Sequence, residues 1–366
     1  HQTRTHLPTH PPDHLMVPVP VDLIRQWTSA VLLAEGLTPD DACIVADSLV
    51  FADLRGVSTH GLMRLPTYVA RTRAGGIDPV GSISIIADLG ALVVVDSGHG
   101  PGAATAMHAT TIVIERAREH GIGCVIARNA NHFGASAYFT NQIADADMLG
   151  VAACNTEPVM CAPFGGAPIL GTNPIALAVP LPRTGRPQLD MATTTTSQGR
   201  LIMAARDGTE IPLGWAVDSR GRPTTSPQAG LDGALLPMGG YKGFGLAFAV
   251  DALLALAGAN VSTGVAALQG DDSVPQRLGH LLIAVQADAA VTLAEYRSSI
   301  RGLVDAVHAS GDGLDVPAPL VPGEPEISRE RESGGFIEVS THVREDLAEV
   351  ARTSGVPLPM ELVSTA

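Results

Sequence analysis

Residues 123–153 read GCVIARNANHFGASAYFTNQIADADMLGVAA, and this stretch decides the fold class. Two short apolar runs, Gly123–Ala127 and Leu149–Ala153, flank a helical pattern near Ser136–Ala146. Short apolar runs bounded by turn residues predict buried strands, whereas a longer periodic segment predicts a helix. The stretch therefore predicts a strand, a helix and a second strand, as in proteins that pack helices against a sheet.

The same two patterns extend along the rest of the chain. Further predicted strands are Ile83–Ala87 and Leu92–Asp96 around a hairpin turn, Pro174–Val179, Gln188–Met191 and Gly279–Val285. The predicted helices are Val21–Glu35, a helix capped by Thr38 that ends near Arg55, Pro101–Glu119, Gly243–Ala257 and Val343–Ser354. Residues 193–240 are rich in Gly, Pro and Thr and are predicted to form long surface loops. Because strands and helices do not alternate strictly, we expect an α/β, non-Rossmann layered fold with a mixed sheet.

The composition argues against several classes of protein. The chain has 366 residues, of which 45% are hydrophobic and 16% charged, and its formal net charge is −14. These values are typical of a globular protein with two or three domains. A nucleic-acid surface needs clustered Lys and Arg, and a membrane span needs a longer apolar run than any in this chain. We therefore expect neither a nucleic-acid partner nor a membrane partner.

The cysteines and the first residues point to a reducing compartment. The four cysteines have neither C-x-x-C pairing nor histidines at metal-site spacing; they are Cys43, Cys124, Cys154 and Cys161. We therefore expect no metal site and a cytoplasmic protein. Residues 1–14 are polar, with four histidines and three prolines, and are predicted to be a flexible tail without secretory features.

Residues 53–68, which read DLRGVSTHGLMRLPTY, contain the first candidate site. In a continuous helix His60, Arg64 and Tyr68 would share one face, since they are four residues apart. Pro66 favours another local structure, in which the helix begins only after Arg64 and His60 lies in an ordered turn. Either structure brings His60 and Arg64 close together.

An adjacent imidazole and guanidinium suit a small organic acid. The imidazole of His60 can give or take a proton near neutral pH, and the guanidinium of Arg64 can hold a carboxylate through two parallel hydrogen bonds. Together they fit an acid whose neighbouring carbonyl is reduced. The alternative is a surface turn with a salt bridge to Asp53 and no catalytic role.

Four other segments lie beside predicted strands, and three of them are candidate ligand contacts. Residues 129–136 (NANHFGAS) open a predicted helix, whose free backbone N–H groups can bind an anion. In residues 171–174 (GTNP) and 190–193 (DMAT), Thr and Asn equally suit ordinary turn bonds. Residues 98–102 (GHGPG) depart from the dinucleotide pattern G-x-G-x-x-G, and we discount them as a phosphate loop.

Lys242 is the only lysine in a chain that has 22 arginines, and it lies in Gly-Tyr-Lys-Gly, residues 240–243. A lysine is a compact point charge on a slim stem, whereas an arginine is a planar fork. We interpret Lys242 as a ligand contact, with chance survival of one lysine as the alternative. A Schiff-base lysine, as in aldolases or pyridoxal-phosphate enzymes, is a further alternative.

Taken together, these segments resemble the malate/L-lactate dehydrogenase family that lacks the Rossmann fold. That family includes ureidoglycolate dehydrogenase, diketogulonate reductase, sulfolactate dehydrogenase and a piperideine-2-carboxylate reductase. The resembling blocks are residues 55–68, 131–134, 171–174, 190–192, 240–243 and 322–324. One block would be a weak signal, but six in the family's order are specific.

The resemblance implies an oxidoreductase that uses NAD or NADP to interconvert a small 2-oxo acid and the corresponding 2-hydroxy acid. It also implies a homodimer with active sites near the subunit interface. The cofactor domain, residues 131–278, would be inserted in a catalytic and dimerisation domain made of residues 15–130 and 279–366. The choice between NAD and NADP stays open, because no Rossmann fingerprint locates the residue that binds the ribose.

The same resemblance assigns roles to individual residues. His60 matches the proton donor and Arg64 the anchor of the substrate carboxylate, and His132 is a second candidate for the acid-base residue. Thr59, Tyr68 and Thr172 are expected to contact the substrate. The positions that match cofactor contacts are His132, Phe133, Gly134, Ala135, Ser136, Thr156, Asp190, Met191, Ala192, Lys242, Gly243, Pro322, Gly323 and Glu324.

Two positions depart from the family pattern. Thr59 stands where many members have Ser, which keeps a hydroxyl beside His60. Arg200 follows Gly199 where the cyclic-imine reductases have Asp, and this difference favours an open-chain 2-oxo acid. The alternatives are a reductase of a cyclic imine carboxylate and a non-catalytic carboxylate-binding module.

Overall fold

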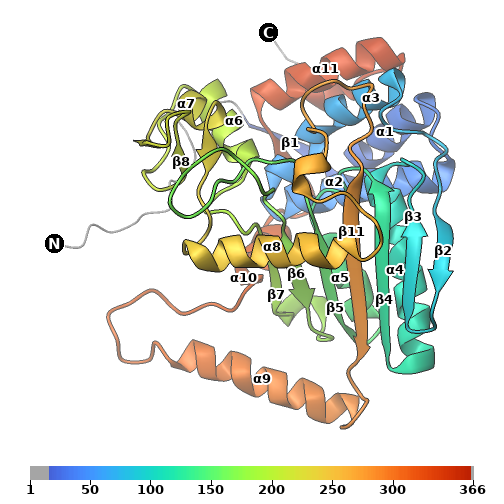
Figure 1. The fold of residues 1–366 in the computed structure, drawn as a ribbon, viewed down its shortest axis with the longest axis vertical. Helices are drawn as coiled ribbons and strands as arrows, with labels where there is room; N and C mark the ends of the chain where they lie inside the picture. The colour runs from blue at the N-terminus through green and yellow to red at the C-terminus, as the bar shows by residue number, and fades with distance from the viewer. Residues whose placement is uncertain (1–15, 364–366) are drawn as a thin grey trace.

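The computed structural model describes residues 16–363, so the tail predicted for residues 1–14 lies outside the described part of the chain. Its main sheet has seven strands in the order β2-β3-β4-β11-β5-β6-β7 (Figure 1). They are β2 (Ser84–Asp88), β3 (Leu92–Asp96), β4 (Ile122–Ala130), β5 (Met148–Cys154), β6 (Ile175–Ala178), β7 (Gln188–Met191) and β11 (Leu278–Gln286). The pair β3 and β4 is parallel and the other neighbours are antiparallel. The predicted mixed sheet is therefore confirmed.

Strand β11 occupies the centre of this sheet, between β4 and β5. Because successive side chains on a strand point to opposite faces, Leu282 and Ala284 join the core on one side, while Leu281 and Ile283 join the smaller core on the other. The sheet takes strands from both expected domains, and β11 begins where the inserted domain was expected to end. The division into an inserted and a surrounding domain stays a prediction.

The larger core lies on the side of the sheet covered by α4 (Gly102–His120) and α5 (Ala137–Asp145). The helices α1 (Val21–Ala34) and α2 (Pro39–Leu54) add their apolar faces to the same core. Helix α2 begins as predicted, because the hydroxyl of Thr38 accepts a hydrogen bond from the backbone N–H of Asp41 at 3.2 Å.

A two-stranded sheet and the last helix add to the same core. Strand β1 (Val17–Pro20) pairs antiparallel with β12 (Phe336–Val339), and α11 (Thr341–Ser354) follows and contacts α3 (Leu65–Ala74). Single 3-10 turns lie at Arg183–Gly185, Ser262–Gly264 and Met360–Leu362.

The opposite face of the sheet is covered by one helix, α8 (Tyr241–Ala255), which crosses the strands in Figure 1. Val250 and Leu254 of α8 pack on Ile126 and Leu281 of the sheet. Other aliphatic side chains on this face stay only partly buried; they are Leu92, Val94, Cys124, Ile175 and Ile283. One helix is therefore too small to cover this side of the sheet.

The prediction of long surface loops for residues 193–240 is wrong in part. The segment contains α6 (Gln198–Arg206), α7 (Pro227–Leu231) and a three-stranded sheet of β8 (Ala216–Val217), β9 (Pro223–Thr224) and β10 (Ala234–Leu235). A small core stabilises it, with Leu201, Ile211, Ala216 and Leu235 buried together. Its elements are too short for a periodic pattern to emerge among the glycines and prolines.

Two further helices, α9 and α10, were not predicted. Helix α9 (Leu293–Ala309) begins with a capping box, in which Thr292 and Glu295 exchange side-chain and backbone hydrogen bonds. None of its residues is buried, and Figure 1 shows it apart from the main body. Helix α10 (Glu324–Glu332) follows the predicted Pro-Gly turn and carries Pro325 in its first turn, where a proline is tolerated.

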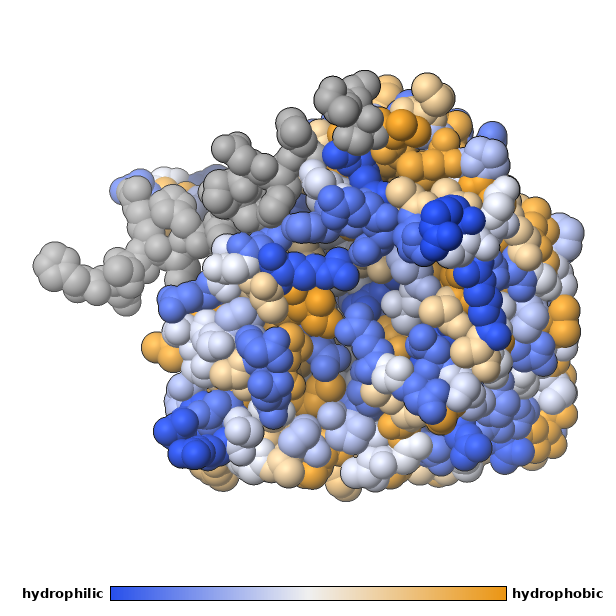
Figure 2. All heavy atoms as spheres, turned by 90° about the horizontal axis from the view of Figure 1, so that it is seen from above, coloured by the Kyte–Doolittle hydropathy of each residue, from blue (hydrophilic) through white to orange (hydrophobic). Residues whose placement is uncertain are grey.

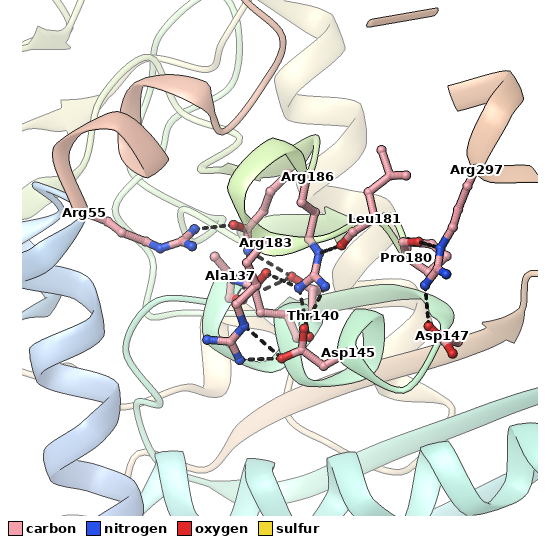
Figure 3. A network of polar contacts seen from close by, with 12 residues as sticks. Arg55, Ala137, Thr140, Asp145, Asp147, Pro180, Leu181, Arg183, Arg186 and Arg297 are labelled. Carbon is pink, nitrogen blue, oxygen red and sulfur yellow. Dashed lines mark hydrogen bonds and ion pairs between the residues drawn. The ribbon is translucent and has the colours of Figure 1, made fainter. Parts of the chain in front are cut away.

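A network of arginines links α5 to the turn after β6 and to α9 (Figure 3). The guanidinium of Arg186 is buried and donates to the carbonyl of Leu181, to Asn141 and to Asp145. Arg297 of α9 donates to the carbonyl of Pro180 and forms an ion pair with Asp147. These bonds fix the start of β7 against α5, so that residues from both elements meet in one cavity.

Candidate active site

A cavity of about 710 Å³ lies between the end of α2, the start of α5, strand β7, the start of α6 and the Pro-Gly turn before α10. This volume is in the range of sites for small ligands and cofactors. Most of the predicted site residues line it; they are Thr59, His60, Arg64, His132, Gly134, Ala135, Ser136, Thr156, Thr172, Asp190, Met191, Ala192, Pro322 and Gly323.

Five predicted site residues do not line this cavity. Tyr68 and Phe133 are buried just behind its wall, where Tyr68 bonds to His132 and Phe133 stacks on Phe139. Gly243 is buried against the carbonyl of Thr193, while Lys242 is exposed. Glu324 begins α10 and accepts hydrogen bonds from Val321 N and from His308. Their expected roles stay predictions.

His60 and Arg64 lie in two consecutive 3-10 turns, Ser58–His60 and Leu62–Arg64, and α3 begins at Leu65. The interpretation in which the helix starts after Arg64 is therefore confirmed. Asp53 fixes the turns, because its carboxylate accepts a hydrogen bond from Leu62 N at 2.8 Å. Gly61 is required here, since a Cβ at this position would lie 2.0 Å from Asp53 Oδ1.

The side chain of Arg64 is buried and oriented for a ligand. Its Nε donates to the carbonyl of Thr59 at 2.7 Å, and its exposed fraction is 7%. Within residues 16–363 its two Nη groups have no hydrogen-bond acceptor. A guanidinium anchored through Nε keeps the paired donors that bind a carboxylate in two parallel bonds.

Two histidines face this guanidinium. His60 Nδ1 lies 2.9 Å from Thr59 Oγ1, and His132 Nδ1 lies 2.7 Å from the hydroxyl of Tyr68. In each ring the bond at Nδ1 leaves Nε2 for a ligand. The backbone N–H of His132 is also fixed, since it donates to Gln276 Oε1 at 3.0 Å.

Burial keeps both imidazoles neutral in the free site. It lowers the pKa of His60 from 6.5 to about 3, with a smaller contribution from the charge of Arg64. Burial also lowers the pKa of His132 well below 6.5, and the neighbouring His60 and Arg64 act in the same direction. A bound carboxylate would compensate the charge of Arg64 and raise the pKa of both rings.

Two carboxyl groups on the cavity wall have raised pKa values, which the sequence did not predict. Burial raises the pKa of Glu157, which follows Thr156 and accepts a hydrogen bond from Leu268 N. Burial also raises the pKa of Asp190 to about 6. Asp190 accepts a hydrogen bond from Ala137 N at 2.8 Å, so its own carboxylate binds the first turn of α5.

The other end of the cavity contains residues that sequence reasoning missed. Arg55 donates to Glu330 and to Gln188, and its guanidinium lies 4.4 Å from the ring centre of Phe51. Arg55 lies in one of the blocks that resemble the family, but its partners Gln188 and Glu330 are far from it in the sequence. No local pattern therefore indicated that the three side chains meet.

No cluster of His, Cys, Asp and Glu that could hold a metal ion is found in the described part of the chain.

A sequence model of the malate/L-lactate dehydrogenase family matches residues 19–348. The chain belongs to this family. It is 37% identical to the L-sulfolactate dehydrogenase of Methanocaldococcus jannaschii over 89% of this chain and 94% of that protein. It is 35% identical to the malate dehydrogenase of Pyrococcus abyssi over 94% of this chain and 97% of that protein.

Solved structures of the family have the same fold. The malate dehydrogenase of Entamoeba histolytica superimposes with a TM-score of 0.90 at 28% identity, over 94% of this chain and all of that one. The sulfolactate dehydrogenase of M. jannaschii gives a TM-score of 0.85 at 35% identity, over 93% of this chain and 98% of that one. The predicted family, the non-Rossmann fold class and the class of enzyme, an NAD(P)-dependent 2-hydroxyacid dehydrogenase, are confirmed.

The residues of the cavity fit a nicotinamide dinucleotide. Gly134 opens the loop before α5 with a φ of +80°, and a Cβ there would meet no atom closer than His60 O at 3.8 Å. Any side chain at Gly134 would therefore occupy the space of a ligand. Backbone groups of residues 134–136 and 190–192 and the turn at 322–323 line the same space.

Proposed function

We propose that the chain interconverts a small 2-oxo acid and its 2-hydroxy acid with His60 as the acid-base residue and Arg64 as the carboxylate anchor. The observation that carries this proposal is the pairing of a neutral imidazole with a guanidinium whose Nη groups are free, on the wall of one cavity. The relatives named for malate and sulfolactate act on 2-hydroxy acids, which supports the same chemistry here.

The protein's own groups bind and orient the acid. The Nη groups of Arg64 hold the substrate carboxylate, and this places the neighbouring C2 oxygen beside the imidazole of His60. The bound dinucleotide supplies the hydride in reduction and accepts it in oxidation. Because Thr59 binds Nδ1 of His60, the proton passes between Nε2 and the C2 oxygen.

Charge compensation prepares His60 for this step. In the free site the charge of Arg64 helps to keep the pKa of His60 low. Burial is the larger cause of that low pKa, but a carboxylate bound to Arg64 offsets the charge and is itself an anion beside the ring, so the acid raises the pKa of His60 and favours its protonation. The protonated ring is then the donor during reduction, and the neutral ring is the acceptor during oxidation.

The test is a substrate panel with the purified chain. Open-chain 2-oxo acids and a cyclic imine carboxylate are each mixed with NADH and with NADPH, and the loss of nicotinamide absorbance is followed. The proposal expects turnover with one or more 2-oxo acids. Saturable ligand binding without nicotinamide oxidation would instead identify a carboxylate-binding module, and turnover of the imine alone would identify an imine reductase.

We further propose that the protein is a homodimer, on the evidence of its exposed apolar surface. Large exposed side chains lie on the outer face of α8 and at its C-cap; they are Tyr241 (73%), Leu246 (38%), Phe248 (62%) and Leu253 (44%) of the helix and Leu256 (72%) of the cap. Beside it lies the incompletely covered sheet, and α9 has no buried residue. The face in Figure 2, in contrast, mixes hydrophilic and hydrophobic side chains. A second copy of the chain would bury the apolar face of α8.

Light scattering of Phe248→Glu tests the homodimer. The charge on the outer face of α8 should yield a folded monomer, whereas Phe164→Glu should leave the dimer intact, because Phe164 is fully exposed in a loop outside α8. Wild-type protein that runs as a monomer at micromolar concentration would contradict the proposal.

The described residues contain no helix that could span a membrane. Our proposal of a cytoplasmic location is supported by the four cysteines, all of which are free.

A further inference from the structure

Glu326 is a carboxylate on the cavity wall without a partner from the protein. It lies in the first turn of α10, is half-buried and lines the active-site cavity. In the described part of the chain its side chain has no hydrogen-bond or ion-pair partner. The other two acidic residues of the wall are bound by backbone N–H groups, Asp190 by Ala137. The second, Glu157, is bound by Leu268. Glu326 is therefore the acidic group of the wall that is left for a ligand.

The loop before α5 connects the two ends of the cavity. It starts beside the catalytic residue, since a Cβ at Gly134 would lie 3.8 Å from His60 O. At the end of the loop, the carbonyl of Ala137 accepts a hydrogen bond from Gln188 Nε2 at 2.9 Å. The amide oxygen of Gln188 in turn accepts from the guanidinium of Arg55. The loop therefore leads from His60 at one end of the cavity to Arg55 at the other.

The turn before α10 packs on the Arg55 end. The backbone N–H of Gln188 donates to the carbonyl of Pro322 at 2.8 Å. Gly323 has a φ of +91°, and a Cβ there would lie 2.9 Å from Gln188 O, so the turn fits closely on β7. Helix α10 begins at the next residue, and the charge of Glu326 acts on Arg55. Glu326 therefore lies at the end of the cavity opposite the catalytic residues.

Hydride transfer fixes the orientation of a dinucleotide in this cavity. The nicotinamide must lie beside the C2 carbon of the acid that Arg64 and His60 hold. The pyrophosphate then passes residues 134–136, which line the cavity between its two ends. The adenosine half consequently extends to the end where Glu326 lies.

The arginines of the wall leave no unpaired positive charge at the adenosine end. Arg64 holds the substrate, and Arg200 follows Gly199, whose Cβ would lie 3.2 Å from Arg64 Nη2. Arg55 is the remaining arginine of the wall, and its Nε forms an ion pair with Glu330 at 2.9 Å. The 2′-phosphate of NADP carries about two negative charges and would meet no unpaired guanidinium on this part of the wall.

Two further arginines lie near this end but do not line the cavity. Arg183 is paired with an aspartate of α5, and the side chain of Arg329 lies against Gly56, where a Cβ would be 2.8 Å from Arg329 Cδ. On the wall itself, burial raises the pKa of Asp190 to about 6, and the charge of Glu326 acts in the same direction. The wall therefore presents an unpaired acidic group, and no unpaired basic group, to the adenosine half.

We propose that the cofactor is NAD rather than NADP, and that Glu326 selects it by binding the ribose of the adenosine half. A carboxylate accepts a hydrogen bond from the 2′-hydroxyl of NAD and repels the 2′-phosphate of NADP. The inference rests on the proposed function, in which the cavity binds a dinucleotide with its nicotinamide beside His60. It adds the choice of cofactor and the residue that makes this choice.

The test measures binding to the purified protein and requires no turnover. Isothermal titration gives the Kd of NADH and of NADPH for wild type and Glu326→Gln. The same titrations with 5′-ADP and 2′,5′-ADP probe the adenosine half alone. The matched control is Glu332→Gln, since Glu332 is exposed at the end of α10 and does not line the cavity. Melting temperatures of all variants verify that each is folded.

We expect wild type to bind NADH more tightly than NADPH by about tenfold or more, and 5′-ADP more tightly than 2′,5′-ADP. Glu326→Gln keeps a hydrogen-bond acceptor but removes the charge, so it should weaken NADH and strengthen NADPH. The preference for NADH should then fall by about fivefold or more, and Glu332→Gln should leave it unchanged.

Three results would count against these expectations. Wild type that prefers NADPH would overturn the inference while leaving the proposed function intact. An unchanged preference in Glu326→Gln, or an equal loss of affinity for both cofactors, would overturn the role of Glu326. Wild type that binds neither dinucleotide would count against the proposed function itself.

Discussion

The rings of His60 and His132 lie nearly parallel, with their centroids 5.6 Å apart and 26° between their planes. Two cationic rings at this distance would repel each other, so the pair takes up one proton before it takes up two. Both rings also lie near the guanidinium of Arg64, whose charge lowers the pKa of each. Binding of an anion to Arg64 therefore favours protonation of this pair, although burial is the larger cause of its low pKa values. The first prediction asks which ring carries the proton.

His60→Ala should lower kcat by about 100-fold or more, the usual scale for loss of a general acid. His132→Ala should have a smaller effect on kcat, because His60 keeps its hydroxyl partner Thr59. Stopped-flow turnover with a saturating 2-oxo acid measures both. Tyr68→Phe is the control, since it removes the bond to His132 Nδ1 and leaves His60 unchanged. Near-native turnover of His60→Ala, with loss in His132→Ala, would assign the proton transfer to His132.

Binding of a 2-oxo acid analogue should be coupled to proton uptake. The pKa of His60 is about 3 in the free protein and is raised when a carboxylate offsets Arg64. Between these two pKa values the complex binds one proton more than the free protein. Affinity therefore falls by up to about tenfold per pH unit as pH rises towards the pKa of the complex, and it levels off above that pKa. Calorimetry with oxamate in two buffers of different ionisation enthalpy measures the uptake. His60→Asn should abolish it, and uptake that persists in that variant contradicts the assignment.

Gly199→Ala should damage the substrate site although it adds only one methyl group. The new Cβ would lie 3.0 Å from Thr59 Cβ and 3.2 Å from Arg64 Nη2, so both side chains must shift. A shift of a fraction of an ångström in the carboxylate anchor should lower kcat/KM by about tenfold or more. Gly185→Ala is the control, since no atom would lie within 4 Å of its Cβ. Equal kinetics of the two variants would show that the contact tolerates the methyl group.

The sequence and the structure agree best where the relevant contacts are local. His60 and Arg64 could be paired because they lie four residues apart, and Pro66 correctly marked the start of α3. The approach of Gly199 to Arg64 could not be predicted, since the two residues are far apart in the sequence and α6 is held in place by the small core around Leu201.

The same distinction applies to the fold. The predicted strands were found within a few residues of their observed ends, but no local pattern shows that β11 inserts between β4 and β5. Helix α9 is a different case. Its capping box, from Thr292 to Glu295, is visible in the sequence and could have predicted the helix.

Arg71→Met should destabilise the protein and loosen one wall of the cavity. Arg71 is fully buried, and its guanidinium donates to the carbonyls of Ala267, Leu268 and Val274. Loss of this side chain removes three charge-assisted hydrogen bonds and leaves the carbonyl of the buried Leu268 unpaired, so the free energy of unfolding should fall by about 3 kcal/mol or more. Urea denaturation measures this. Arg73→Met on the same helix removes a partly exposed ion pair with Glu35 and should cost at most about 1 kcal/mol. A loss for Arg71→Met no larger than that of the control would contradict the role of Arg71.

Lys242→Arg should weaken the binding of cofactor or substrate although the charge is kept. Lys242 lies on the exposed first turn of α8 and does not line the cavity of its own chain, so we expect this effect only in the proposed homodimer, where a second chain covers α8. Isothermal titration with NADH and with the preferred acid measures both affinities, and light scattering verifies that the variant still dimerises. A dimeric variant with wild-type affinity for both ligands would show that the single lysine of the chain has no role in ligand binding.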